Sequence, residues 1–277
     1  MQLTGRPPSG VAFDCDLGAR PGTPLAVEVL FALDQKSECR VISMATTRTH
    51  LHSAAYLDAI YRFYSGTGPF VRPLPIGMAL KGPTDALPHL EKALQRHNHQ
   101  IQRLADTADP YAVLRNAFTT QFDGNGLAIL CGPATNFAKV LDLPGSRELI
   151  AQKCKLMVAA LDESRRAADS AAAERLLAEW PSPLVVCDWD GKLPAAAIPA
   201  EHPSGLAEPA GSELPGLDCA AMLAAVRPNE TYFRYTGEGR RRTVTIDPAQ
   251  QDRAIMAMVE LANAKPQPRT APPKRPV

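Results

Sequence analysis

The chain has 277 residues, which is enough for one large α/β domain or two smaller ones. Its 30 Lys and Arg residues balance 29 Asp and Glu residues, so no overall field attracts nucleic acid or an anionic membrane. Six cysteines are scattered without a CxxC pair, which argues against a zinc site or a disulfide framework. No run of about 18 apolar residues occurs, so we expect no membrane span. The N-terminal stretch lacks an apolar core, and this favours a cytoplasmic location.

Strand and helix patterns alternate along the chain. A short apolar run at 11–13 leads into two acids, then a loop rich in Gly and Pro, then an apolar run with helical spacing at 25–33. Further strands are predicted at 40–45, 74–78, 127–131, 155–160, 183–187 and 243–246. Helices are predicted at 53–64, 88–104, 109–122, 135–141, 169–180, 218–226 and 250–264. This alternation predicts a single α/β domain with an open, mostly parallel β-sheet and helices on both faces.

Two segments interrupt the alternation. The stretch 190–216 is crowded with Pro, Ala and Gly, and it predicts a long loop over one edge of the domain. The stretch 265–277 is Pro-rich and basic, and it predicts a disordered tail after a domain at 1–264. Short charge runs such as Arg165-Arg166 are expected to be solvated.

The first candidate functional residues are Asp14 and Asp16, directly after the first strand. In open α/β sheets, ligands bind at the carboxyl ends of the strands. We expect at most one of the two carboxylates to face that crevice, while the other orients the following loop through its N–H groups. Capping of the loop alone is an alternative for both acids. Asp218, before an apolar helix, has the same kind of alternative as an N-cap.

Several stretches resemble, in their order and spacing, the inosine/uridine-preferring nucleoside hydrolases. They are FDCDLGARPGTPLA at 13–26, AYLDAIYRFYSG followed by PLPIG, DGNGLAILCGPATNFAKVLDLPGSRELIAQKCKLMV, AERLLAEWPSPLVV and LDCAAMLAAVRPNETYF. The resemblance covers 11–264, nearly the whole chain. It implies an open α/β fold, bound Ca²⁺ and hydrolysis of the N-glycosidic bond of ribonucleosides.

The resemblance also implies roles for individual residues. In that family Ca²⁺ holds the ribose hydroxyls and a water, and a carboxylate acts on this water as a base. By position, Asp16 matches a calcium ligand and the catalytic base, and Asp218 matches a late ligand that also meets the substrate. The strand-tip carbonyl that completes the metal site falls at Cys131. Asp14 and Thr47 are expected to bind the substrate.

The implied cation site is incomplete in this sequence. The family's adjacent acid pair falls on Gly22 and Thr23, and Arg20 stands where a further acid is usual. Leu217 occupies a position that often carries a histidine acid. Because the charge of the ligands sets Ca²⁺ affinity, we expect Ca²⁺ binding to be weak or absent. Arg20 is instead expected to pair with one of the two strand-tip acids.

Three functions therefore stay open: hydrolysis of a ribonucleoside or related riboside, ligand binding or scaffolding without catalysis, and altered metal-free chemistry. The missing acid pair favours binding or scaffolding without catalysis, whereas the retained Asp16 and Asp218 are consistent with hydrolysis. The expected partner is a small nucleoside or riboside, not a nucleic acid or a membrane. The resemblance further implies a homo-oligomer.

Overall fold

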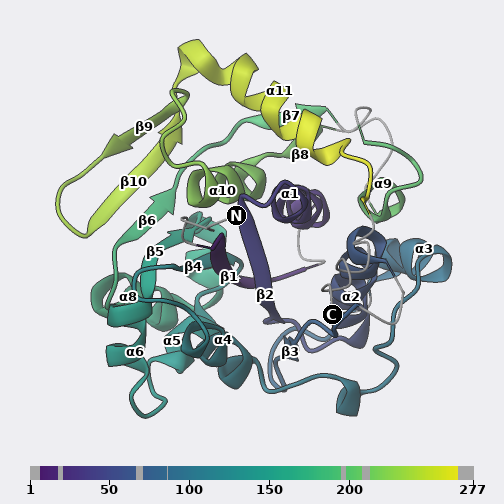
Figure 1. Cartoon of the computed structure of the whole chain (residues 1–277), viewed down its shortest axis with the longest axis horizontal. Coiled ribbons are helices and arrows are strands. Elements are labelled where there is room, and N and C mark those ends of the chain that lie inside the picture. Colours follow the sequence, from purple (N-terminus) through teal and green to yellow (C-terminus); the bar gives the residue numbers. More distant parts are fainter. Residues whose placement is uncertain are drawn as a thin grey trace, which may run out of the picture.

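The computed structural model describes residues 7–17, 21–66, 71–85, 87–194, 198–207 and 213–267. An eight-stranded sheet in the order β3-β2-β1-β4-β5-β6-β10-β9 runs through the molecule (Figure 1). Its neighbours are parallel except for the antiparallel pair β10 and β9. The strands are β1 Ser9–Cys15, β2 Cys39–Thr46, β3 Ile76–Met78, β4 Gly126–Cys131, β5 Cys154–Ala159, β6 Leu184–Cys187, β9 Phe233–Thr236 and β10 Arg241–Ile246.

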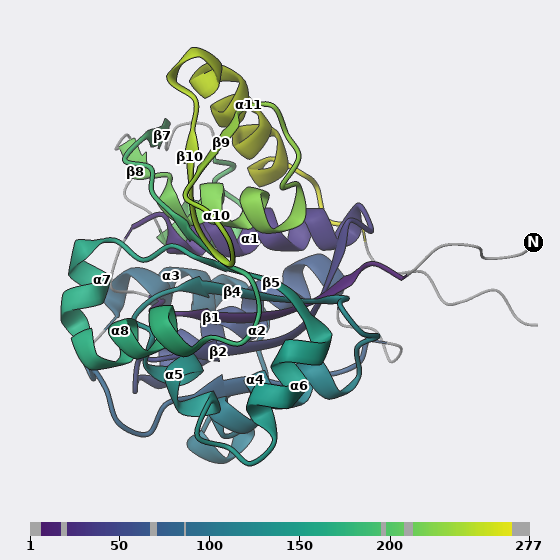
Figure 2. The same cartoon turned by 90° about the vertical axis from the view of Figure 1, so that its left-hand side faces the viewer.

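Helices cover both faces of this sheet. Figure 2 shows α1, α10 and α11 on one side of the strands and α4, α5, α6 and α8 on the other. The helices are α1 Thr23–Gln35, α2 Leu51–Ser65, α3 Pro88–Arg96, α4 Pro110–Thr119, α5 Thr135–Val140, α6 Ser146–Lys153, α7 Glu163–Ala168, α8 Ser170–Glu179, α9 Pro203–Ala207, α10 Leu217–Val226 and α11 Gln251–Ala262. The predicted α/β class, with a mostly parallel sheet in a single domain, is confirmed.

The central strand β1 divides the core into two layers. Val11, Phe13 and Cys15 belong to the cluster formed with α1, α2 and α10, whereas Ala12 belongs to the cluster formed with α4, α5 and α8. All of these side chains are fully buried. Strand residues alternate between the two faces of a sheet, so a strand covered by helices on both sides reads as a continuous apolar run. The same alternation points Asp14 toward the α4 and α5 layer.

Two predicted elements differ in the structure. The expected helix at 88–104 ends at Arg96, because the chain turns so that the Gln100 N–H can donate to Asp58 on α2 at 2.6 Å. The expected loop at 190–216 contains an antiparallel pair, β7 Lys192–Pro194 with β8 Glu213–Pro215, and the short helix α9. Leu193 and Leu214 face each other in this pair and are buried. This apolar pair stabilises strands in a stretch whose Pro and Gly content predicted only a loop.

The N-cap of α2 is also different from the expected one. The cap is His50, whereas Ser53 lies inside the helix and its hydroxyl contacts Thr46 Oγ1 at 2.8 Å and the Leu17 carbonyl at 3.1 Å. Most of the predicted tail, 268–277, lies outside the described residues, as does Arg20. The start of that tail is attached to α1, since Gln35 and Gln267 exchange two hydrogen bonds of 3.1 Å.

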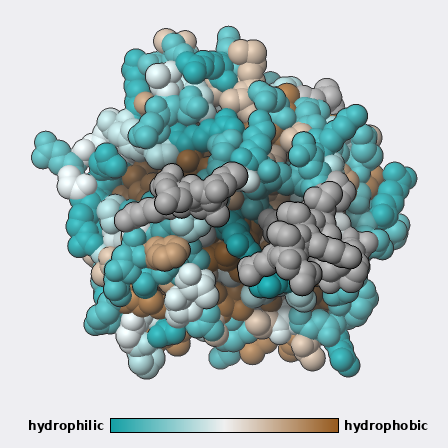
Figure 3. Space-filling view, viewed as in Figure 1, coloured by the Kyte–Doolittle hydropathy of each residue, from teal (hydrophilic) through white to brown (hydrophobic). Residues whose placement is uncertain are grey.

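Hydrophilic residues cover most of the face seen in Figure 3, as the balanced charge content suggests. The large apolar side chains exposed on the described part of the surface are Leu80, Leu104, Phe122 and Met256, which belong to four separate segments. Within the described residues, no helix combines the length and the apolar character that crossing a bilayer requires.

Candidate functional site

The candidate site lies where the strand order reverses. β1 is flanked by β2 on one side and β4 on the other, so chain connections leave this point in opposite directions. The carboxyl ends of β1 and β4 meet there, with Cys15 beside Cys131. Gly132 lets the two strand ends approach, because a Cβ at this position would lie 2.6 Å from the Asp16 nitrogen. The strand-tip acids therefore stand at the crevice position of the fold.

Asp14 is fully buried and turned away from solvent. Its Oδ1 accepts a hydrogen bond of 2.9 Å from Asn136 Nδ2 on α5, while its Oδ2 and Asn136 Oδ1 have no partner among the described residues. Burial raises the pKa of this carboxyl to about 8, against the opposing effect of the Asn136 hydrogen bond. This raised pKa favours the protonated form of Asp14 at neutral pH.

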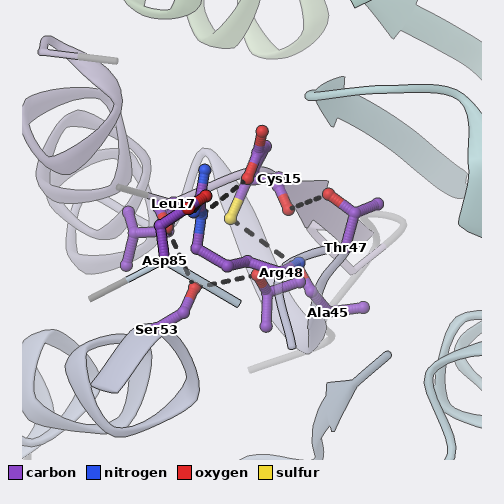
Figure 4. A network of polar contacts seen from close by, with 9 residues as sticks. Cys15, Leu17, Ala45, Thr47, Arg48, Ser53 and Asp85 are labelled. Carbon is purple, nitrogen blue, oxygen red and sulfur yellow. Dashed lines mark hydrogen bonds and ion pairs between the residues drawn. The ribbon is translucent and has the colours of Figure 1, made fainter. Parts of the chain in front are cut away.

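Asp16 lies just beyond the end of β1 and pairs with Arg48, which follows β2. Arg48 Nε is 3.1 Å from Asp16 Oδ1. Arg48 also reaches Asp85, with Nη1 3.3 Å from Asp85 Oδ2 (Figure 4). The Arg48 side chain is 7% exposed, the Asp16 side chain 14% and the Asp85 side chain 83%. One guanidinium thus bridges a half-buried carboxylate at the crevice and an exposed one outside it.

Asp218 is held by a second arginine. Arg165 on α7 donates to Asp218 through Nη1 at 2.5 Å and through Nη2 at 2.8 Å, and its Nη1 also donates to the Ala160 carbonyl. Thr23 Oγ1 donates to Asp218 Oδ2 at 2.6 Å. Burial acts to lower the pKa of Arg165, but the Asp218 carboxylate outweighs burial and raises it above its usual range. The alternative interpretation of Asp218 as an N-cap is wrong, since Gly216 is the N-cap of α10.

Gly22 and Thr23 occupy the positions at which the resemblance places the acid pair. Their backbone and side chains fit the contacts around Asp218 instead. Gly22 is the N-cap of α1 with φ 92°, a left-handed conformation that favours glycine. A Cβ on Gly22 would lie 2.4 Å from the Pro215 carbonyl oxygen. A carboxylate at position 22 is therefore incompatible with the present loop, independently of its charge.

A cleft of about 200 Å³ opens to solvent beside the Arg165–Asp218 pair. The segment from the end of β6 to the start of α10 supplies much of its wall, and α7 contributes Arg165 on one side. In Figure 2, α7, β7 and β8 lie at the same end of the molecule, the end at which β1 finishes. The lining residues are Pro21, Asp162, Arg165, Cys187, Asp188, Trp189, Asp190, Gly191, Pro215, Leu217 and Asp218.

Two of the predicted site residues contribute backbone and hydroxyl groups to internal contacts. The Cys131 carbonyl, the expected metal ligand, accepts the Asp16 N–H at 3.2 Å. Thr47 is 6% exposed, and both its N–H and its hydroxyl donate to the Cys15 carbonyl, at 3.0 and 3.3 Å (Figure 4). Burial, then the charges of Asp14, Asp16 and Asp218, raise the pKa of the Cys15 thiol.

The residues present do not fit a family-type Ca²⁺ site. Within the described ranges, no group of three or more His, Cys, Asp or Glu side chains is placed to hold a metal ion. Ca²⁺ needs about six to eight oxygen ligands. Of the carboxylates implied by the resemblance, Asp16 and Asp218 both contact arginines. A cation at this position must therefore displace at least one guanidinium.

The two arginines are the site residues that sequence reasoning missed. Arg165 belongs to a charge run that was expected to be solvated, yet its side chain is 6% exposed. Arg48 was hidden in a polar loop, 32 residues from its partner along the chain. The sequence contains one hint of such arginines. Two carboxylates at one edge of the sheet, without the cation that the family usually binds there, need another positive charge nearby. This argument selected Arg20, which lies outside the described residues.

No protein-family model and no curated protein matches the sequence. Solved structures do match. They include the type III effector protein XopQ complexed with adenosine diphosphate ribose, with a TM-score of 0.65, 14% identity and coverage of 95% of this chain and 96% of that chain. A plant nucleoside hydrolase, PpNRh1, has a TM-score of 0.63 and 15% identity over 93% of this chain and 100% of that one.

The effector protein XOO4466 has a TM-score of 0.66 and 13% identity over 95% of both chains. These similarities extend over nearly all of the described fold, and at this level of identity they define the architecture. The chain thus has the nucleoside hydrolase fold, as the resemblance implied.

Proposed function

We propose that this protein is a nucleoside hydrolase-like binding protein that recognises a ribose-containing small molecule without Ca²⁺-dependent hydrolysis. The observation that carries this proposal is the contact set of Asp218. Arg165 bonds both of its carboxylate oxygens and Thr23 bonds one of them, all inside the protein. A carboxylate saturated in this way is a poor metal ligand.

The second acid of the implied site supports the same conclusion. Asp16, the expected catalytic base, contacts the Arg48 guanidinium at 3.1 Å. A base must be within hydrogen-bond reach of the water that it activates. Because Asp16 is engaged by Arg48, it is poorly placed to act as the base that ribosyl transfer to water requires.

The binding role rests on the cleft and on the structural neighbours. The cleft lies at the carboxyl ends of the strands, the usual ligand position of an open α/β sheet. One neighbour with this fold is described in complex with adenosine diphosphate ribose, and another is described as a nucleoside hydrolase. Ribosides are therefore the ligand class that we infer for this chain.

Two measurements on the full chain test this proposal. Free ribose is assayed after incubation with inosine or uridine, with Ca²⁺ and with a chelator, and riboside binding is followed by calorimetry in the chelator. We expect riboside binding and no ribose release under either condition. Ca²⁺-dependent release that disappears in Asp16→Asn would instead establish the hydrolase, the role that the resemblance implies.

A further inference from the structure

We propose that Arg165 binds the vicinal hydroxyl groups of the ribose, through the edge of its guanidinium group that Asp218 leaves free. This inference rests on the proposed riboside binding and assigns the residue that recognises the sugar. Arg165 and Asp218 both line the cleft at the carboxyl ends of the strands, so this edge lies where the riboside is expected.

The hydrogen bonds of Arg165 use three N–H donors of its guanidinium group. Nη1 donates to Asp218 Oδ1 at 2.5 Å and to the Ala160 carbonyl at 2.8 Å, and Nη2 donates to Asp218 Oδ2 at 2.8 Å. The Nε–H and the second N–H of Nη2 have no acceptor among the residues that the structure describes. These two donors lie side by side on one edge of the planar group and form a second fork.

This second fork is open to the cleft. In the described part of the chain, Arg165 Nε is not one of the solvent-shielded atoms that lack a partner, although the side chain as a whole is largely buried. The nitrogen therefore keeps access to solvent on the side of the cleft that Arg165 lines. The second fork can thus meet a ligand while the contact with Asp218 stays closed.

The position of the fork is fixed before any ligand binds. The backbone N–H of Arg165 donates to Asp162 Oδ1 at 3.0 Å, at the start of α7. Asp218 and the Ala160 carbonyl hold the other end of the side chain. Donors that are held in this way lose little conformational freedom on binding, so more of their hydrogen-bond energy contributes to affinity.

The compensated charge of Arg165 favours neutral hydroxyl groups over an anion. Both carboxylate oxygens of Asp218 contact the guanidinium group, and Thr23 Oγ1 donates to the same carboxylate at 2.6 Å. The free edge therefore offers two directed hydrogen bonds without an uncompensated positive charge. Two vicinal hydroxyl oxygens provide the two neighbouring acceptors that such a fork requires.

The size of the cleft matches a single sugar ring. Its volume of about 200 Å³ is below the roughly 300–1,000 Å³ of sites that enclose a drug-sized ligand. Pro21, Pro215 and Leu217 line the same cleft and provide carbon surface for the ring. The donors of Arg165 and this carbon surface together suit the polar and apolar parts of a ribose.

The first test uses the wild-type full chain in chelator and varies only the sugar. Calorimetry should show uridine binding at least about tenfold more tightly than 2′-deoxyuridine or 3′-deoxyuridine, because each analogue leaves one charged donor without its acceptor. In protein that contains isotope-labelled arginine, the Nε–H resonance of Arg165 should shift more at saturation with uridine than with either analogue. This second readout reports on Arg165 itself and needs no variant.

Arg165→Lys keeps a positive charge beside Asp218 but removes the fork. Its preference for uridine over the two analogues should fall below about threefold, with folding checked by urea denaturation. Arg166→Lys is the matched control, because Arg166 is exposed, lies outside the lining of the cleft and donates to the Leu161 carbonyl. This variant should keep the full preference. If Arg165→Lys does not fold, the wild-type affinities and the Arg165 resonance decide.

Three results would overturn the assignment. Equal binding of uridine and both analogues would exclude hydroxyl recognition by Arg165 and leave the proposed riboside binding intact. Displacement of uridine by inorganic phosphate at an equal concentration would identify an oxyanion site instead. If neither uridine nor inosine binds, the proposed function fails, and the role of Arg165 fails with it.

Discussion

The two acid–arginine pairs of the site are both largely buried but differ in their contact geometry and in whether the arginine is shared. Asp218 and Arg165 are 5% and 6% exposed, and they meet through two hydrogen bonds. Asp16 and Arg48 are 14% and 7% exposed, they meet through one contact of 3.1 Å, and Arg48 is shared with the exposed Asp85. The first pair is a closed structural unit, whereas the second remains open to exchange with solvent or a ligand.

The comparison shows two ways of neutralising carboxylates in a site of this shape. Buried charges need a close partner, since an unpaired one is very costly in a low-dielectric interior. At the Asp218 end, α7 brings an arginine into direct bidentate contact. At the Asp16 end, a loop arginine divides its charge between two acids. We therefore expect the Asp218 end to govern stability and the Asp16 end to respond to salt and ligands.

The largest effect is expected from breaking the closed pair. Arg165→Met leaves Asp218 buried without its counter-charge, and removal of one partner of a buried pair costs about 3–5 kcal/mol. The free energy of unfolding, measured by urea denaturation, should fall by that amount. Arg166→Met is the matched control, because the neighbouring Arg166 is exposed and its side chain donates to the Leu161 carbonyl rather than to a buried acid. A similar loss in both variants would contradict a specific role of the closed pair.

A second effect tests whether the loop beside this pair can accept the family's acid. Gly22→Ala places a Cβ 2.4 Å from the Pro215 oxygen at φ 92°. Strain in the left-handed region and displacement of backbone together should lower the free energy of unfolding by about 2–4 kcal/mol.

Gly145→Ala separates the two causes. Gly145 is also a helix N-cap, with φ 70°, but nothing lies within 4 Å of its Cβ position. Only the conformational strain remains there, so a loss of about 1–2 kcal/mol is expected in the same urea experiment. Equal losses in the two variants would show that the contact with Pro215 does not restrict position 22.

A third effect, which builds up over several pH units, concerns Asp14. The folded-state pKa of about 8 lies above the ordinary Asp pKa of 3.8 expected in the unfolded chain, so the folded protein holds this proton over the interval between them. The stabilisation is fully present below about pH 4 and is lost as pH rises through about 8, at no more than about 1.4 kcal/mol per pH unit. Asp14→Asn should remove this slope, because the amide cannot ionise.

The measurement is urea denaturation of wild type and Asp14→Asn across pH 5 to 8. Their difference should grow in favour of the variant as pH rises. Asp109→Asn serves as the control, since Asp109 is an exposed N-cap on α4 whose loss is not expected to reproduce the slope. Parallel curves for wild type and Asp14→Asn would mean that Asp14 is ionised in the folded protein.

The sequence predicted the fold more completely than it predicted the contacts of the candidate site. Apolar runs such as 11–13 and 127–131, each followed by polar or Gly-rich segments, predicted the parallel sheet, and both became central strands. The acids at the carboxyl ends of strands were also recognisable, because position along a βα unit determines which edge they occupy. Their ligand roles remain predictions, since no bound molecule reports on them.

The partners of those acids could not be predicted. A short-range pattern cannot distinguish an arginine that turns inward from one that remains solvated. Arg165 and Arg166 are adjacent and identical in type, yet only the first is buried, because the turn of α7 points it at Asp218. Similarly, the stretch 190–216 reads as a loop, whereas tertiary contacts with Glu28, which bonds His202 and Ser204, anchor it to α1.

The smallest effect is expected at the open pair. Asp85→Asn removes an 83% exposed partner of Arg48 and should change the free energy of unfolding by less than about 0.5 kcal/mol. Arg48→Gln removes the contact with the half-buried Asp16 as well, and about 1–2 kcal/mol is expected. Both losses should shrink at high salt, whereas the Arg165→Met loss should persist, because buried pairs are screened much less. If the Arg48 and Arg165 variants showed the same salt dependence, the two ends of the site would be electrostatically equivalent, and the distinction between a closed and an open pair would be wrong.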